Sequence, residues 1–171
     1  MRSFHWRKGL ASTVLCLVLL ITGCQTAPSP YEQVQVESTQ KNAPAAVAKD
    51  ATQGSEFNAF FPEAEEGYDR VYTQEKKGFA QAKLKKEGTD LAMLSISDTS
   101  SLPNAAAKYA DTTDTLAGYP MVEIGSTQTA ILVAERYQVK VLSRDPSFSA
   151  SDRQEWIQKF KLSELAQLDP S

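Results

Sequence analysis

Very few side chains of this 171-residue chain can act as nucleophiles or as soft metal ligands. The only histidine is His5, and the only cysteines are Cys16 and Cys24. From Gln25 to its end the chain has neither residue type. That part of the chain therefore lacks the side chains for Ser-His-Asp or Cys-His catalysis and for a zinc site with histidine or cysteine ligands.

The segment that contains His5 and both cysteines has the pattern of an export signal. Its first eight residues carry three basic side chains, and an apolar run from Leu10 to Ile21 follows. This run has about a dozen residues, whereas a helix that crosses a bilayer needs about twenty. We therefore expect residues 1–23 to be a signal peptide rather than a permanent membrane span.

Directly after the apolar run stand Ile21, Thr22, Gly23 and Cys24. This order resembles the lipobox of bacterial lipoproteins, which has an aliphatic residue, two small residues and an obligatory cysteine. The resemblance implies signal-peptidase recognition through Ile21, Thr22 and Gly23, cleavage before Cys24, and acylation of Cys24 with chains such as palmitate. More than one acyl chain is needed for stable anchoring. The alternative is an ordinary signal peptide with a chance Gly-Cys pair.

The lipobox predicts a protein held by lipid on the periplasmic or outer side of a bacterial membrane. In lipoproteins of some two-membrane bacteria, an aspartate after the lipidated cysteine favours retention in the inner membrane. Gln25 stands at this place and favours the outer membrane. Because the rule differs between lineages, the choice between inner and outer membrane stays open.

Removal of the signal peptide makes the chain more acidic. The precursor has 18 basic and 21 acidic residues, and the removed segment holds three of the basic residues and no acid, so the formal net charge falls from −3 to −6. An acidic chain is a poor partner for nucleic acid because it repels the phosphate backbone. We expect no nucleic-acid partner.

Other motifs that carry chemistry are absent or badly placed. The glycine-rich phosphate-binding and nucleophile-elbow patterns do not occur. Asp98, Asp111 and Asp114 flank a predicted helix, and their oxygens suit calcium, but EF-hand spacing is missing and turn capping explains them more simply. We predict no catalytic residue, no metal site and no cofactor.

Lysines are concentrated in one predicted hairpin, where they are Lys76, Lys77, Lys83, Lys85 and Lys86. On a domain tethered to lipid they could contact anionic headgroups, at about 1 kcal/mol for each charge near the surface. Lysines on an edge strand also prevent edge-to-edge pairing of sheets, which is the stronger interpretation.

The mature chain divides by composition into two parts. Residues 24–54 are rich in Gln, Ala, Ser, Thr and Pro and show no sustained period, which predicts a lipidated cysteine followed by a disordered tether. Residues 55–169 contain most of the aromatic and branched side chains and are predicted to fold as one globular domain.

Alternation at period two predicts two antiparallel meanders in this domain. The strands of the first are expected at 68–75, 79–86 and 90–97, and those of the second at 121–124, 129–135 and 137–141. A short helix is expected over 56–61 with Ser55 as its cap, a second over 104–110 with Asn104 or Ser101 as its cap, and a third after Ser149, with Asp152 completing the cap.

These elements predict an α+β domain with an antiparallel sheet of about six strands and two or three helices packed on it. The order, two three-strand halves separated by a helix and closed by a C-terminal helix, is similar to that of small periplasmic or lumenal α/β/α sandwiches such as the PsbP-like family. Trp156 and Phe160 are expected to pack on the sheet. Tyr109, Tyr119 and Phe148 stand beside turns, where they either close the core or mark a partner surface.

The sequence therefore favours a membrane-anchored lipoprotein that acts as a non-catalytic binding or interaction module of the cell envelope, with a possible envelope protein partner. One alternative is a hydrolase-type enzyme that uses carboxylates, lysine or tyrosine, which requires a cleft with paired carboxylates. Another is a carrier of a small apolar ligand, which requires a hollow between the sheet and the helices.

Overall fold

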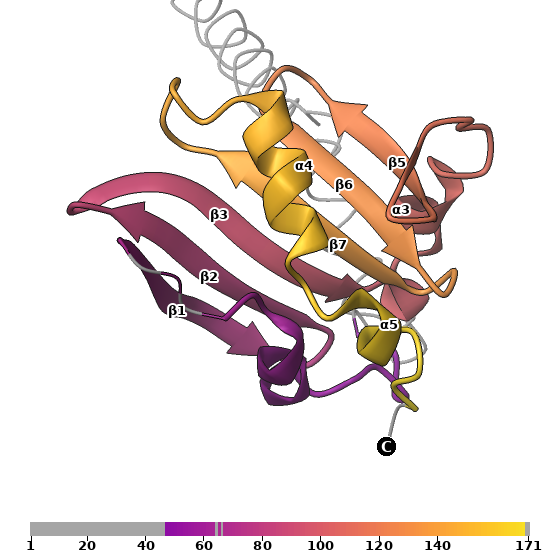
Figure 1. Ribbon diagram of the computed structural model, residues 1–171. Coiled ribbons are helices and arrows are strands. Elements are labelled where there is room, and N and C mark those ends of the chain that lie inside the picture. Colours follow the sequence, from indigo (N-terminus) through magenta and orange to yellow (C-terminus); the bar gives the residue numbers. More distant parts are fainter. Residues whose placement is uncertain (1–46, 64, 66, 170–171) are drawn as a thin grey trace, which may run out of the picture. The chain divides into compact units, whose positions relative to one another are not determined.

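An antiparallel sheet of seven strands organises the part of the chain described by the computed structural model, residues 47–63, 65 and 67–169. The strand order is β1-β2-β3-β7-β6-β5-β4, so each half of the sheet is a meander and the halves meet where β3 pairs with β7 (Figure 1). The strands are Tyr68–Lys76 (β1), Phe79–Lys86 (β2), Thr89–Asp98 (β3), Thr115–Leu116 (β4), Tyr119–Ile124 (β5), Gln128–Val133 (β6) and Tyr137–Ser143 (β7).

Short helices cover mainly one face of this sheet (Figure 1). They are η1 (Gly54–Phe60), α4 (Ala150–Gln158) and α5 (Leu162–Leu165), while η2 (Thr99–Ser101) and α3 (Pro103–Ala107) lie between the two meanders in the sequence. Within the described residues no helix is long and apolar enough to span a membrane.

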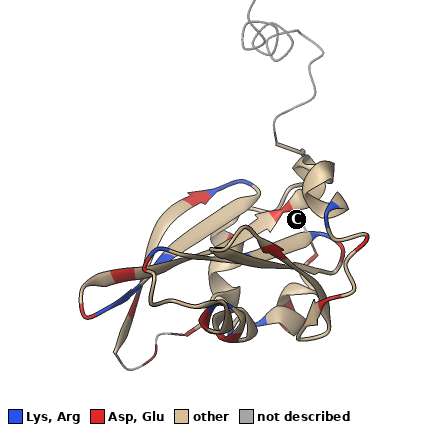
Figure 2. Cartoon of the chain, turned by 90° about the horizontal axis from the view of Figure 1, so that it is seen from above, with Lys and Arg blue, Asp and Glu red and all other residues tan. Residues whose placement is uncertain are grey.

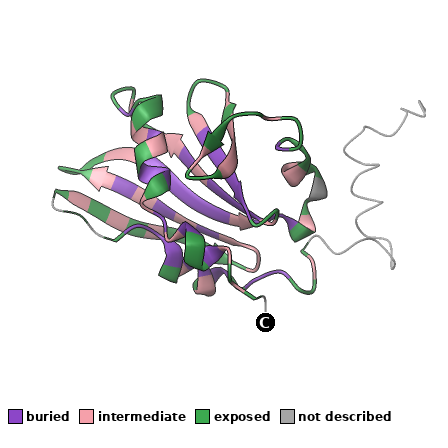
Figure 3. Cartoon of the chain, turned by 45° about the vertical axis from the view of Figure 1, so that its right-hand side comes forward, coloured by how far each residue is buried: buried purple, intermediate pink, exposed green. Residues whose placement is uncertain are grey.

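The main core lies between the sheet and η1, α4 and α5. Each long strand contributes alternate side chains to it, for example Ala80, Ala82 and Leu84 from β2, all at most 1% exposed. Figure 3 shows this as a band of buried strand segments. Aromatic side chains from the helical layer fill the other half of the core, including Phe57, Phe61, Trp156 and Phe160.

A smaller cluster lies on the opposite face. It joins Tyr109, which follows α3, to Ala130 and Leu132 of β6, whose neighbours in the strand point to the main core. Gln138 of β7 donates a hydrogen bond of 3.0 Å to the hydroxyl of Tyr109. The α3 region thus covers the second face at β5 to β7.

The fold is α+β, with an antiparallel sheet in two meanders. The expected number of about six strands is one too low, because β4 is a strand of only two residues. Ala117 and Gly118 form the tight turn between β4 and β5, with positive φ angles of 51° and 83°. A two-residue strand has no alternation that a sequence pattern can reveal.

Two predicted helix caps are wrong. Ser55 lies inside η1, whose N-cap is Gln53 and has no side-chain cap bond. Leu102 caps α3, again without a side-chain bond, and the hydroxyl of Ser101 instead accepts the backbone N–H of Ala48 at 2.7 Å. The cap of α4 is confirmed, because Ser149 and Asp152 form a reciprocal capping box.

The predicted start of the domain at Ser55 is too late. Ala51 and Thr52 are each 1% exposed, and the described residues belong to one compact unit. Gly54 lies so close to the β1–β2 turn that an added Cβ would be 2.5 Å from the carbonyl oxygen of Lys76. Polar contacts hold this segment, which explains why its low apolar content did not reveal it.

Candidate functional site

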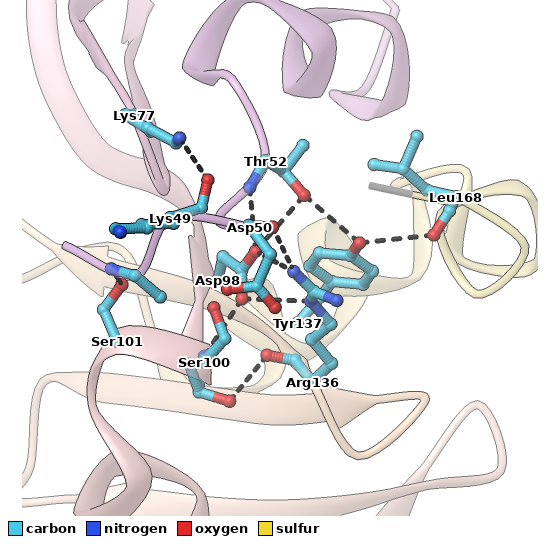
Figure 4. A network of polar contacts seen from close by, with 12 residues as sticks. Lys49, Asp50, Thr52, Lys77, Asp98, Ser100, Ser101, Arg136, Tyr137 and Leu168 are labelled. Carbon is cyan, nitrogen blue, oxygen red and sulfur yellow. Dashed lines mark hydrogen bonds and ion pairs between the residues drawn. The ribbon is translucent and has the colours of Figure 1, made fainter. Parts of the chain in front are cut away.

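A buried carboxylate stands where the start of the described chain meets the sheet. Asp98 ends β3, and Arg136 and Tyr137 come from the β6–β7 turn and the start of β7. Thr52 belongs to the segment before η1. We call these four residues the Asp98 cluster (Figure 4).

The Asp98 carboxylate accepts hydrogen bonds at both oxygens. Arg136 donates from Nε to Oδ1 at 3.1 Å and from Nη2 to Oδ2 at 2.8 Å, a bidentate pair. Thr52 donates its backbone N–H at 3.0 Å and its hydroxyl at 3.2 Å to Oδ2. The backbone N–H of Ser100 completes the set at 3.0 Å from Oδ1.

This arrangement keeps Asp98 ionised. The side chain of Asp98 is fully buried and that of Arg136 is 25% exposed. Burial by itself raises the pKa of Asp98, but the hydrogen bonds from Arg136, Thr52 and Ser100 outweigh it and bring the pKa to about 2. A carboxylate with so low a pKa is a poor proton donor or acceptor near neutral pH, and here it accepts hydrogen bonds from three separate segments.

The cluster also ties the start of the domain to its end. The hydroxyl of Tyr137 lies 3.2 Å from that of Thr52 and donates to the carbonyl of Leu168 at 3.2 Å. Arg136 Nη2 also donates to the carbonyl of Asp50 at 2.8 Å. The first described segment is thus hydrogen-bonded to the end of β3 and the start of β7, the two strands at which the meanders meet.

A second buried cation fixes α4 to the sheet. Arg153 is 3% exposed and donates to Thr129, Ser143 and Glu123 at 2.8, 3.1 and 3.0 Å. It lines a polar groove of about 300 Å³ beside Arg144 and Asp145. Ser147 donates hydrogen bonds to Asp145 and lowers its pKa, so the groove contains an ionised carboxylate and no carboxylate pair among the described residues that line it.

The five lysines of the predicted headgroup patch do not form one surface. Lys76 and Lys77 stand at the β1–β2 turn, whereas Lys85 and Lys86 lie at the far end of β2 (Figure 1). Figure 2 likewise shows lysine and arginine positions spread over several elements.

The lysines of β2 make contacts of two kinds. Lys83 and Lys85 form ion pairs with Asp90 at 2.7 and 3.6 Å. Lys86 lies 4.9 Å from the ring centroid of Tyr68, on the helix-covered face. Lys76 makes a similar contact with the ring of Phe79. Ion pairs therefore compensate Lys83 and Lys85, whereas Lys76, Lys77 and Lys86 form none among the described residues.

The aromatic residues beside turns mostly belong to the core. Tyr109 and Phe148 are 4% and 6% exposed, and Tyr119 is partly buried against the main cluster. Trp156 and Phe160 are buried on the sheet, as predicted. Among the residues described by the structure, no group of three or more His, Cys, Asp or Glu side chains is placed to hold a metal ion.

The predicted lipidation site, Cys24, and the predicted recognition residues Ile21, Thr22 and Gly23 lie outside the described residues. The same holds for the signal peptide and for residues 24–46 of the predicted tether. These predictions continue to rest on the sequence.

Sequence reasoning missed the roles of Thr52, Arg136 and Arg153. Thr52 and Arg136 are 46 and 38 residues away from Asp98 in the chain. No local spacing indicates such contacts. The one available signal was an aspartate at the end of an apolar strand, which we interpreted as a turn residue.

Comparison of the chain with protein-family models, with curated proteins and with solved structures finds no match.

Proposed function

We propose that this chain is a bacterial lipoprotein whose domain serves as a non-catalytic binding or interaction module of the cell envelope. The observation that carries the proposal is the Ile21-Thr22-Gly23-Cys24 sequence directly after an apolar run with a basic start. Acylation of Cys24 leaves the mature chain without a free thiol, and cleavage removes the only histidine.

The chemistry of the domain supports a binding role over a catalytic one. The buried ionisable groups Asp98 and Arg153 form hydrogen bonds with neighbouring elements and connect those elements to one another. An enzyme that used carboxylates would need one with a raised pKa in a cleft. The pKa values of Asp98 and Asp145 are lowered instead.

The packing argues against carriage of an apolar ligand. Phe57 and Phe61 from the η1 region and Trp156 from α4 fill the layer between sheet and helices. The ring centroid of Phe61 lies 5.4 Å from that of Tyr72 and 5.3 Å from that of Phe160. The three rings are therefore in direct contact.

The anchoring part of this proposal is tested by two matched substitutions in the full precursor, expressed in a bacterial host with labelled palmitate. Cys24→Ser should abolish the label and release the protein from the membrane fraction. Cys16→Ser, inside the apolar run, should leave both unchanged. A labelled, membrane-bound Cys24→Ser protein would refute lipidation at this residue.

The binding part is tested by cross-linking the lipidated wild-type protein in the membranes of its own cells and identifying the products. A stoichiometric envelope partner is expected. A hydrolytic activity of the purified protein that is lost on substitution of a carboxylate, lysine or tyrosine would instead support the enzyme alternative.

A further inference from the structure

We propose that one end of the domain rests on the membrane surface and contacts anionic lipid headgroups. This end, which we call the anchor-side end, consists of Val47, Lys49, Lys76, Lys77 and Leu102. The inference rests on the proposed lipid anchor, and it replaces the lysine set expected from the sequence.

Apolar side chains are exposed at the anchor-side end. Leu102 is 62% exposed and Val47 is 38% exposed, and both line a groove of about 180 Å³ together with Phe79. Large aliphatic side chains in water carry an unfavourable free energy that contact with lipid relieves. Two such residues beside one groove suit shallow contact with the headgroup region.

Basic side chains surround this groove. Lys76 and Lys77 line it directly. Nζ of Lys77 donates to the carbonyl of Lys49 at 2.6 Å, and the side chain of Lys49 extends away from Asp98 in Figure 4. Nζ of Lys76 lies 5.4 Å from the ring centroid of Phe79. None of these contacts neutralises a lysine charge.

Few carboxylates oppose these charges. Asp98 is buried and paired with Arg136. Glu75 accepts a hydrogen bond of 2.6 Å from Asn58 of η1, on the helix side of the hairpin. Asp50 is exposed, and the neutral amide of Asn58 leaves the charge of Glu75 in place. Three lysines therefore stand beside two exposed carboxylates, which leaves a small positive excess. At about 1 kcal/mol for each basic residue near an anionic surface, the excess favours contact.

The position of the proposed anchor favours a membrane, rather than a protein, as the binding partner of the anchor-side end. Cys24 is separated from Val47 by the 22 residues 25–46. A chain of this length spans at most about 75 Å when fully extended, and about 25 Å on average when flexible. Because the chain from Cys24 enters the domain at Val47, a membrane anchored at Cys24 lies within reach of this end. Tethering raises the effective concentration of a weak contact.

The opposite end of the same hairpin supplies an internal control. Lys85 and Lys86 end β2, whereas Lys76 ends β1 and Lys77 lies in the β1–β2 turn. The two pairs are therefore at opposite ends of the hairpin. Lys85 is paired with Asp90, but Lys86 forms no ion pair among the described residues, so a contact set by free charge alone would involve Lys86 as well. A contact set by the anchor-side end would not involve it.

The first test uses the mature lipidated protein, residues 24–171, in phosphatidylcholine vesicles with about 30% phosphatidylglycerol, and measures acetylation of each lysine by mass spectrometry. Lys49, Lys76 and Lys77 should react at least threefold more slowly than in vesicles of phosphatidylcholine alone, and 0.5 M salt should remove this difference. Lys85 and Lys86 should react equally in both. Equal protection at both ends, or none, would overturn the proposal.

Two further outcomes also count against it. Protection of the same three lysines in detergent without vesicles would indicate that another segment of the chain covers the groove. Protection in native membranes but not in anionic vesicles would indicate a protein partner.

The second test does not depend on lipidation. The mature chain with Cys24→Ser is sedimented with the same anionic vesicles, and Lys76→Gln/Lys77→Gln is compared with Lys85→Gln/Lys86→Gln. The first pair should reduce binding at least fivefold and the second less than twofold, with circular dichroism confirming that both fold. Equal effects would overturn the surface contact, whereas a failure of palmitate labelling in the precursor would refute only the anchor.

Discussion

The Asp98 carboxylate accepts hydrogen bonds from the adjacent η2 and from two segments that are distant in sequence, the segment before η1 and the β6–β7 turn. A buried charge with so many donors is costly to disturb, because removing it leaves Arg136 and the Thr52 N–H without their acceptor.

Asp98→Asn should therefore reduce the free energy of unfolding by about 2–4 kcal/mol, since the pair is buried on one side and partly exposed on the other. The matched control is Asp90→Asn near the start of the same strand, whose side chain is 41% exposed and paired only with lysines. It should cost at most about 1 kcal/mol. Urea unfolding of both variants measures the difference, and similar losses would contradict a bracing role for Asp98.

The low pKa of Asp98 also predicts acid sensitivity. The pKa is about 2 in the folded protein, compared with 3.8 for an unperturbed aspartate. Because the folded-state pKa is depressed, the stabilisation is present above about pH 4 and is lost as the pH falls toward 2. It amounts to about 2 kcal/mol.

In Asp98→Asn the fall in stability between pH 4 and pH 2 should be smaller than in the wild type by this amount. Thermal unfolding across that range measures it. An unchanged pH profile in the variant would mean that other carboxylates govern acid unfolding.

The elements show where the sequence was sufficient. The limits of β2 were predicted correctly from the alternation of Ala80, Ala82 and Leu84 and from the preceding turn. Gly78 lies in that turn with a φ of 78°. The N-cap and the apolar face of α4 were also predictable, because Ser149, Asp152 and Trp156 lie within one local sequence pattern.

Elements held by distant contacts were not predictable in this way. The segment 48–52 is placed by polar bonds to Ser101, Asp98 and Gly78, and none of these is a neighbour in the sequence. The same reason explains why the Asp98 cluster was missed although Asp98 itself was noticed. By composition alone this segment resembles the residues before it, which the sequence predicts to be a tether.

The close approach of Gly54 to the β1–β2 turn gives a test of that packing. In Gly54→Ala the new methyl group would lie 2.5 to 2.7 Å from backbone atoms of Lys76 and Phe79. Because backbone atoms cannot rotate away, we expect a loss of about 1–3 kcal/mol. Ser55→Ala, at an exposed neighbouring position, should change stability by less than about 0.5 kcal/mol. If the two variants unfold at the same urea concentration, η1 does not pack as described.

In the proposed whole molecule, an export signal and a lipid-modified link lead into a domain whose first and last described segments are joined by hydrogen bonds. The Asp98 cluster connects the entry of the link to the sheet and, through Tyr137, to Leu168 near the end of the chain. These connections suit the proposed anchoring of the domain through Cys24. The lysines illustrate what the sequence could not supply, since five residues close in sequence are divided between two ends of one hairpin.

The most direct measurement is the intact mass of the protein purified from bacterial membranes after expression of the full precursor. Our interpretation predicts a chain that begins at Cys24 and carries a diacylglyceryl group, with or without an additional N-linked acyl chain. The Cys16→Ser precursor should give the same mass. A chain that begins at another residue, or one that begins at Cys24 without lipid, would contradict it.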